Sequence, residues 1–357
     1  MAASEALRVL SVVGARPNFM KIAPLIRAIE RHNSGLTASN ERITRNTEPG
    51  TDNREPGTRN PKPITHLLVH TGQHYDVRMS QAFFDQLDIP PPDIDLEIGS
   101  GSHAEQVGQT MMAFEKVLQE QKPDWVVVVG DVNATCACSI TAKKEHVNLA
   151  HIEAGLRSFD LRMPEEINRM VTDRLSDLLF VTDEIAAGNL RNEGVPEESI
   201  KLVGNVMIDT LEANRGKAET LDIDQLIRDN LLEPEHPHPS ALSPHPSAFA
   251  VLTLHRPSNV DSREILDPLM RFFIEEVCAD MPLLWPIHPR TRKQLEVFGL
   301  WQKARETENL VLLHPIGYHE MLRLNMGAQL MLTDSGGLQE ECCVLGTPCL
   351  TLRENTE

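Results

Sequence analysis

The chain lacks the composition that a nucleic-acid-binding or membrane protein needs. Its 357 residues include 34 Lys and Arg against 52 Asp and Glu, a formal net charge of -18 at pH 7. Nucleic acid and anionic lipid are bound through a basic face, so this surplus of acids argues against both partners. No apolar run approaches the roughly 20 residues that cross a bilayer, and the first residues, MAASEALRVLSVVG, do not form a signal peptide. We therefore expect a cytoplasmic protein.

Metal and dinucleotide motifs are also missing. The six cysteines form no CxxC pair and no zinc-ligand spacing, so we expect reduced thiols and no metal site. Neither a GxGxxG fingerprint nor a Walker loop occurs, and hydride transfer and P-loop hydrolysis lose their usual sequence support. His236, His238 and His245 stand among prolines without Cys or acidic partners, which is typical of a linker rather than a metal centre.

Short apolar strands alternate with amphipathic helices along most of the chain. This alternation predicts doubly wound parallel sheets, one in residues 1–207 and a second in residues 208–357 after a linker at about 233–248. Two such domains facing one another would form a cleft. The expected strands are 7–13, 66–70, 125–129, 148–152, 178–181, 200–203, 249–254, 283–287, 310–313 and 329–332.

Residues 37–63 interrupt the first series. The stretch SNERITRNTEPGTDNREPGTRNPKP is polar, rich in turn formers and contains the near-repeat EPGT-x-N. We expect the first helix to end near residue 32, and a disordered surface insertion to lead to the second strand.

Four acidic residues stand at the ends of segments that the pattern predicts to be buried. Asp131 and Glu153 each follow a short apolar strand, and ligands bind at the carboxyl ends of strands in open α/β sheets. Glu165 and Glu166 follow Pro164 in the first turn of a helix, where the helix dipole favours negative charge and capping alone would explain them. Acids that converge in a cleft raise one another's pKa values and cost stability, so we interpret the set as functional.

Other polar groups follow strands in both halves. Arg16 lies at a strand-to-helix turn that Pro17 opens, either as an anion ligand or as a solvated turn residue. The run from Ser335 to Gly337 connects a strand to a helix N-terminus, an arrangement that suits a diphosphate. Glu340 or Glu341, about a turn further on, could accept hydrogen bonds from ribose hydroxyls.

Nine motifs then point to one family. GARPNFMKIAP, HTGQHYD, VGDVNAT, HIEAGLRS, MPEEINR, VGNVMIDTL, LTLHRPSN, PIHPRT and LTDSGGLQEE recur in family order from about residue 8 to the end. Together they resemble the non-hydrolysing UDP-N-acetylglucosamine 2-epimerases. The resemblance implies the two-domain glycosyltransferase-B architecture, a UDP-sugar substrate, a homodimer, and no metal or redox cofactor.

The resemblance also implies a reaction and roles for single residues. UDP is lost across C1 and C2 of the sugar to give a glycal, and it adds back after the proton returns to C2 on the other face. The resemblance gives catalytic roles to Asp131, Glu153, Glu165 and His255; substrate-binding roles to Arg16, Lys21, His288, Ser335, Gly336, Gly337 and Glu341; and a regulatory substrate site to Gln73 and His74. Which acid serves which face stays open.

Two departures from the family pattern qualify these expectations. Asn18 stands where some members have Glu, and the sequence ends at RENTE, where the pattern continues with a further strand and helices. We therefore expect an incomplete second domain and reduced stability. The alternatives are a hydrolysing epimerase or a glycosyltransferase on the same fold, or an inactive, truncated UDP-sugar-binding protein.

Overall fold

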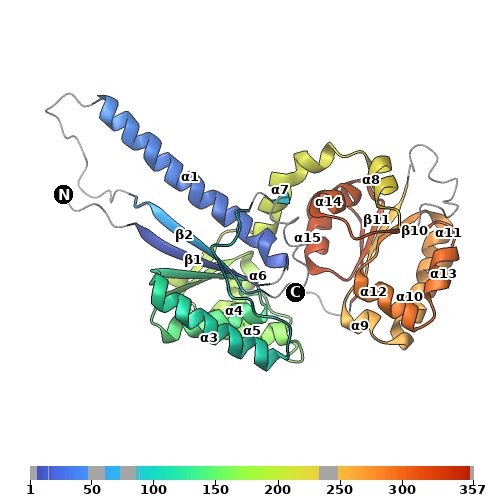
Figure 1. The fold of residues 1–357 in the computed structure, drawn as a ribbon, viewed down its shortest axis with the longest axis horizontal. Coiled ribbons are helices and arrows are strands. Elements are labelled where there is room, and N and C mark those ends of the chain that lie inside the picture. The colour runs from blue at the N-terminus through green and yellow to red at the C-terminus, as the bar shows by residue number, and fades with distance from the viewer. Residues whose placement is uncertain are drawn as a thin grey trace. The chain divides into compact units, whose positions relative to one another are not determined.

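A computed structural model describes residues 6–14, 16–46, 61–72, 86–87, 89–232 and 248–353. The chain divides into two compact units, Met1–Val206 and Met207–Glu357, which are called the first and the second unit below. Each unit carries its own parallel β-sheet with helices around it (Figure 1). The predicted α/β class with two parallel sheets is confirmed.

The first unit is built on a seven-stranded parallel sheet in the order β3-β2-β1-β4-β5-β6-β7. Its strands are β1 Leu7–Val13, β2 Ile64–His70, β3 Ile94–Asp95, β4 Trp125–Val129, β5 Asn148–Ala154, β6 Leu178–Val181 and β7 Ile200–Leu202. The chain winds one way from β1 to β2 and β3, and the other way from β4 onward. The crevice of such a sheet lies outside the carboxyl ends of the strands at this switch point, here after β1 and β4.

Local signals explain where the helices of the first unit begin. Ser102 and Glu105 form a reciprocal capping box at the start of α3, and Pro164 occupies the first position of α5. The helices are α1 Arg16–Asn46, α3 His103–Gln121, α4 Asn133–Lys144, α5 Pro164–Leu175 and α6 Glu184–Asn192, with a 3₁₀ turn at Glu197–Ser199. Helices α3, α4 and α5 lie side by side on one face of the sheet, and α1 lies on the other (Figure 1).

Alternate residues of the central strands fill a core on the face of this sheet that α3 and α4 cover. Leu10, Val126 and Val128 pack with Phe114 and other side chains of α3 and α4. Each fully buried Leu, Val or Phe contributes about 1.5–3 kcal/mol through removal from water. This burial fixes the strand ends, and therefore the polar residues that follow them.

The predicted end of the first helix is wrong. Helix α1 continues to Asn46 rather than ending near residue 32. The sequence between Pro24 and Pro49 has no proline and a single glycine, Gly35, so nothing in it forces the helix to stop. The rest of the expected insertion, up to residue 60, lies outside the described residues, as do residues 233–247 of the expected linker.

The second unit has a five-stranded parallel sheet in the order β10-β9-β8-β11-β12. Its strands are β8 Ala250–Thr253, β9 Leu283–Pro286, β10 Leu310–Leu313, β11 Leu330–Thr333 and β12 Cys349–Thr351. The main helices are α7 Val206–Glu219, α8 Ile223–Asn230, α9 Pro257–Val260, α10 Arg263–Phe272, α12 Pro289–Val297, α13 Trp301–Glu306, α14 Tyr318–Gly327 and α15 Gly336–Leu345, and a π-turn at Phe273–Val277 leads from α10 into α11 Cys278–Asp280. The switch point lies between β8 and β11.

The sheet of the second unit also separates two cores. Leu252 and Trp285 pack with Phe273 on one face, whereas Val251 and Leu284 pack with Leu226 on the other. Among the helices in the described part of the chain, none has the length and apolar character that a bilayer-crossing segment requires.

Candidate functional site

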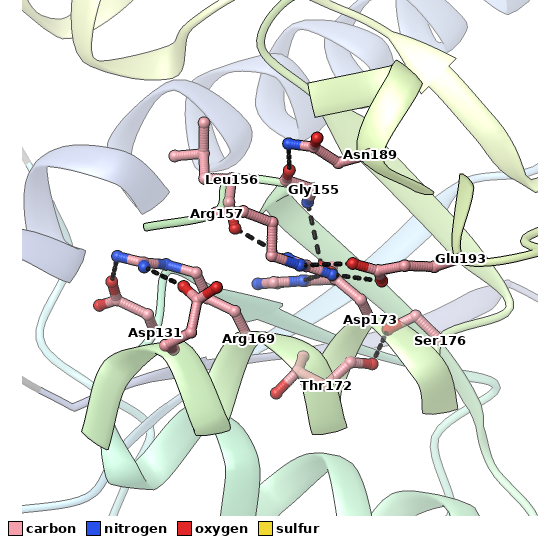
Figure 2. A network of polar contacts seen from close by, with 12 residues as sticks. Asp131, Gly155, Leu156, Arg157, Arg169, Thr172, Asp173, Ser176, Asn189 and Glu193 are labelled. Carbon is pink, nitrogen blue, oxygen red and sulfur yellow. Dashed lines mark hydrogen bonds and ion pairs between the residues drawn. The ribbon is translucent and has the colours of Figure 1, made fainter. Parts of the chain in front are cut away.

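Asp131 follows β4 at the switch point of the first unit and is held by a buried arginine. Its Oδ2 lies 2.5 Å from Nη2 of Arg169, whose side chain is 3% exposed on α5 (Figure 2). The Asp131 backbone carbonyl accepts a hydrogen bond of 2.8 Å from the Asn168 amide. Side chain and backbone of Asp131 are thus both fixed by α5, and the carboxylate keeps 23% exposure.

Three polar side chains converge on Gly130, the residue before Asp131. A Cβ atom at Gly130 would meet Asn18 Nδ2, Lys21 Nζ and Glu153 Oε2 at 3.3–3.4 Å. Gly130 also has φ +66°, which a residue with a side chain rarely adopts. The backbone conformation therefore favours glycine where α1 and β5 bring these groups against the end of β4.

Glu153 occupies a strained position in β5. We expected Glu153 to follow the strand directly, but β5 runs to Ala154. The pairing of β5 with β6 is irregular between Ile152 and Ala154. Glu153 has φ +71° at this bulge, and its 6%-exposed side chain pairs with Lys21 Nζ. Left-handed backbone in a residue other than glycine costs about 1–3 kcal/mol and clusters at functional sites.

Glu165 and Glu166 have different environments in the first turn of α5. Glu165 is half-buried, whereas Glu166 is 1% exposed. Glu166 accepts hydrogen bonds from Ser158 N and Oγ, Phe159 N and Arg169 Nη1, at 2.9–3.1 Å. Burial acts to raise the pKa of Glu166, but these hydrogen bonds outweigh it and lower the pKa. Glu166 therefore anchors the loop before α5.

A network of buried polar side chains connects β5, α5 and α6. His151 Nδ1 lies 2.6 Å from Asp173 Oδ1, and His151 Nε2 lies 2.9 Å from the carbonyl oxygen of Gly130. Arg157 lies between Asp173, at 2.7 Å, and Glu193, which it contacts through two nitrogens at 2.7 Å (Figure 2). Burial acts to raise the pKa of Asp173, but His151 and Arg157 outweigh it and lower the pKa. The network links β5, α5 and α6 to Gly130.

This network was not predicted from the sequence. Its one visible signal is Gly155, which separates Glu153 from Arg157. Gly155 has φ +82°, and a Cβ there would come within 2.4 Å of the Ala186 carbonyl oxygen. The backbone of β5 thus approaches α6 too closely for a side chain.

The side chains of three predicted site residues lie outside the described part of the structure. Arg16 begins α1, but its side chain lies outside the described part of the structure, and Gln73 and His74 lie outside the described residues altogether. Lys21, predicted to bind substrate, pairs with Glu153.

His255 follows β8 in the second unit and contacts a buried aspartate. Its Nδ1 lies 2.8 Å from Oδ1 of Asp334, at the end of β11. The side chain of His255 is 40% exposed, whereas that of Asp334 is fully buried. The His288 ring lies 5.8 Å from that of His255, centroid to centroid, and His288 Nδ1 accepts the Arg290 N–H at the start of α12.

The predicted diphosphate-binding turn begins α15. Ser335 is the N-cap residue in extended backbone, and its N–H donates to Thr333 Oγ1 at 3.0 Å. Gly336 and Gly337 form the first turn, whose N–H groups have no intrahelical acceptors. Such an N-terminus favours an anion.

Glu341 lies further along α15 with an unusual carboxyl group. Burial raises its pKa to about 7, against a lowering by the Tyr318 hydroxyl, and Glu340 adds to the increase. Its side-chain atom Oε2 is buried without a hydrogen-bond partner in the described part of the chain. A buried acceptor of this kind suits a ligand that brings its own donors.

Comparisons with known proteins agree with one another. The family model for UDP-N-acetylglucosamine 2-epimerase matches residues 58–357. A UDP-N-acetylglucosamine 2-epimerase of Methanocaldococcus jannaschii is 39% identical over 347 residues, covering 97% of this chain and 83% of the relative. A UDP-2,3-diacetamido-2,3-dideoxy-D-glucuronate 2-epimerase of Pseudomonas aeruginosa is 36% identical over 353 residues, covering 98% and 84%.

Solved structures give the same result. The crystal structure of the M. jannaschii UDP-GlcNAc 2-epimerase in complex with UDP-GlcNAc and UDP has a TM-score of 0.79 and 38% identity, covering 98% of this chain and 85% of that one. The Neisseria meningitidis enzyme bound to UDP-GlcNAc has a TM-score of 0.77 and 28% identity, covering 98% and 84%.

Proposed function

Because this chain belongs to the UDP-N-acetylglucosamine 2-epimerase family, we propose that it interconverts UDP-N-acetylglucosamine and UDP-N-acetylmannosamine. It is then an isomerase. The observation that carries the proposal is the convergence of Glu153, Lys21 and Asn18 on Gly130, directly beside Asp131. Two carboxylates, each held by a cationic side chain, thus stand at the switch point of one sheet.

This arrangement suits an elimination in which a proton leaves C2 and UDP leaves C1. The C2–H bond has no adjacent carbonyl group to acidify it, so a positioned base must take the proton. Inversion at C2 then needs proton acceptors and donors on both faces of the sugar. Asp131, Glu153 and Glu165 supply three carboxyl groups for these steps, and their division between the faces is left open.

The second unit supplies groups for the nucleotide. We assign the diphosphate to the N-terminus of α15 at Ser335, Gly336 and Gly337, where the N–H groups of the first helical turn favour negative charge. Arg16 is assigned to the diphosphate and His288 to the substrate by family resemblance. We assign the ribose hydroxyls to Glu341, whose buried Oε2 accepts no hydrogen bond from the described residues.

His255 acts in catalysis beside the departing phosphate, a role that suits an imidazole. Gln73 and His74 remain assigned to a regulatory substrate site, and the reaction needs no redox or metal cofactor.

We also propose a homodimer. Phe159, Leu161, Ile167 and Met170 are 44–77% exposed, and the last two stand three residues apart on α5, on one helix face. A second copy of the chain would cover this apolar surface. Light scattering after size exclusion should give twice the chain mass, whereas a monomer at micromolar concentration would contradict the proposal. The surplus of acids supports action without nucleic acid, and the six free cysteines, four of them buried, support a cytoplasmic location.

Proton NMR of UDP-N-acetylglucosamine incubated with the chain in D₂O tests the function. The proposal predicts UDP-N-acetylmannosamine with deuterium at C2. Free N-acetylmannosamine would favour the hydrolysing reaction, and turnover that requires an acceptor would favour a glycosyltransferase. Binding of UDP without turnover would favour the inactive binding protein. UDP-2,3-diacetamido-2,3-dideoxy-D-glucuronate is a useful second substrate, because the P. aeruginosa relative is named for it.

A further inference from the structure

Asp334 is a buried carboxylate that directly contacts a residue assigned to catalysis. It directly follows β11, before the turn at Ser335, and is 0% exposed. Oδ1 lies 2.8 Å from His255 Nδ1. Oδ2 accepts the backbone N–H of His255 at 2.9 Å, that of Arg256 at 2.7 Å, and the Asn259 amide at 3.1 Å.

The contacts determine which ring nitrogen of His255 carries the proton. Burial acts to raise the pKa of Asp334, but the hydrogen bonds from His255 and Arg256 outweigh it and lower the pKa, so the group is a carboxylate at neutral pH. An ionised carboxylate accepts hydrogen bonds and cannot donate one. The nitrogen that faces it, Nδ1, must therefore be the N–H donor. In neutral His255 the lone pair then lies on Nε2.

We propose that Asp334 is the positioning residue of His255, fixing the ring and its tautomer so that Nε2 faces the substrate. The inference rests on the proposed function, because that function makes His255 a catalytic group. Oδ2 takes the loop contacts to Arg256 and Asn259, and Oδ1, which also accepts the His255 backbone N–H at 3.2 Å, lies at hydrogen-bonding distance from the imidazole ring. Because Asp334 also precedes Ser335, it ties the ring to the turn assigned to the diphosphate.

Long-range ¹H–¹⁵N correlation spectra of the labelled chain at pH 8.5 test the tautomer directly. A His255→Gln spectrum identifies the signals of His255. The proposal predicts a protonated Nδ1 and a bare Nε2; a protonated Nε2 with a bare Nδ1 would overturn it. The measurement requires no turnover, so a failure of the epimerase proposal is seen separately in the D₂O experiment.

Asp334→Asn separates positioning from loop anchoring. The amide oxygen can still accept the backbone N–H groups, while its NH₂ faces Nδ1 and forces the proton onto Nε2. We expect the flipped tautomer and a 10²- to 10⁴-fold lower kcat, as when the aspartate of a Ser-His-Asp triad becomes Asn, with the Kd for UDP changed less than about threefold. The matched control is Asp267→Asn, which removes an exposed pair with Arg271 and should change neither quantity.

Two results with Asp334→Asn would overturn the proposal. One is the parent tautomer with the parent kcat. The other is a Kd for UDP that rises in step with the fall in kcat, which would mark Asp334 as an anchor of the binding loop alone. If the variant does not fold, the tautomer in the unmodified chain decides.

Discussion

Lys21 of α1 pairs directly with the carboxylate of Glu153, at the bulge in β5. Neither side chain is more than 16% exposed, so the pair lies largely out of water. Lys21 lies eight residues after the end of β1, and Glu153 lies on β5, two strands away from β1 in the sheet. The pair therefore joins both sides of the switch point at the place where ligands bind in such sheets.

Glu153→Gln should lower kcat by about 10²- to 10⁴-fold, because the amide keeps the shape of the side chain but cannot take a proton. The Kd for UDP should stay within about threefold, since Glu153 is not among the residues assigned to the nucleotide. Steady-state kinetics and calorimetry measure the two quantities. Glu198→Gln, on the exposed turn after α6, is the control and should behave as the parent. Parent-like kcat in Glu153→Gln would remove Glu153 from the catalytic set.

Arg169→Met should destabilise the first unit by about 3–5 kcal/mol, because it leaves the buried Glu166 and the adjoining Asp131 without their cation. Thermal and urea unfolding, followed by hydrogen exchange in β4 and α5, measure the loss. Arg162→Met is the matched control. Arg162 is 88% exposed and pairs with Asp160 at the surface, so its loss should cost less than about 1 kcal/mol. Equal losses of stability from the two changes would show that Arg169 contributes no more to stability than an exposed arginine.

Much of the fold could be predicted because its signals are local. The strand Trp125–Val129 has the predicted bounds, since an unbroken β-branched run is visible in the sequence. The strand Ile94–Asp95 was missed, because two residues in a Pro-rich connection give no periodicity. The end of α1 was misplaced because polar residues without proline do not specify whether a helix continues.

The candidate site could be predicted only in its residue types. Asp131 and Glu153 stand near strand ends, which is visible in the sequence, but their partners are not. Arg169 lies 38 residues from Asp131, and Lys21 lies 132 residues from Glu153. Which charged side chains become buried partners depends on the tertiary fold, so Asp334 beneath His255 could be found only from the structure.

Glu341 should make stability depend on pH between about 4.5 and 7. Its pKa is raised from 4.5 to about 7 in the folded chain, so the folded state binds more protons than the unfolded state in this window. Stability should therefore fall as pH rises from 4.5 to 7 and then level off. Glu341→Gln removes this pH dependence. From pH 4.5 to pH 8, the free energy of unfolding of the variant relative to that of the parent should therefore rise by on the order of 3 kcal/mol. The control, Glu296→Gln, breaks a surface pair with Arg292 and should keep the parent slope, and an identical slope in Glu341→Gln would refute the prediction.

UDP binding at pH 7 should release protons from Glu341. Ribose hydroxyls that donate to this carboxyl group favour its ionised form, so the ligand lowers its pKa. With a pKa of about 7 in the free chain, up to about half a proton should leave per UDP bound. Calorimetry in two buffers of different ionisation enthalpy measures this number. An identical binding enthalpy in both buffers, or proton uptake, would place the ribose elsewhere.

The most direct test of the proposed chemistry is positional isotope exchange. UDP-N-acetylglucosamine carrying ¹⁸O in the bond between C1 and the β-phosphorus is incubated with the chain, and ³¹P NMR follows the label. Elimination and re-addition of UDP predict that the label moves into the non-bridging positions of the β-phosphate while the C2 epimer forms. Epimerisation with the label still in the bridge would contradict the account.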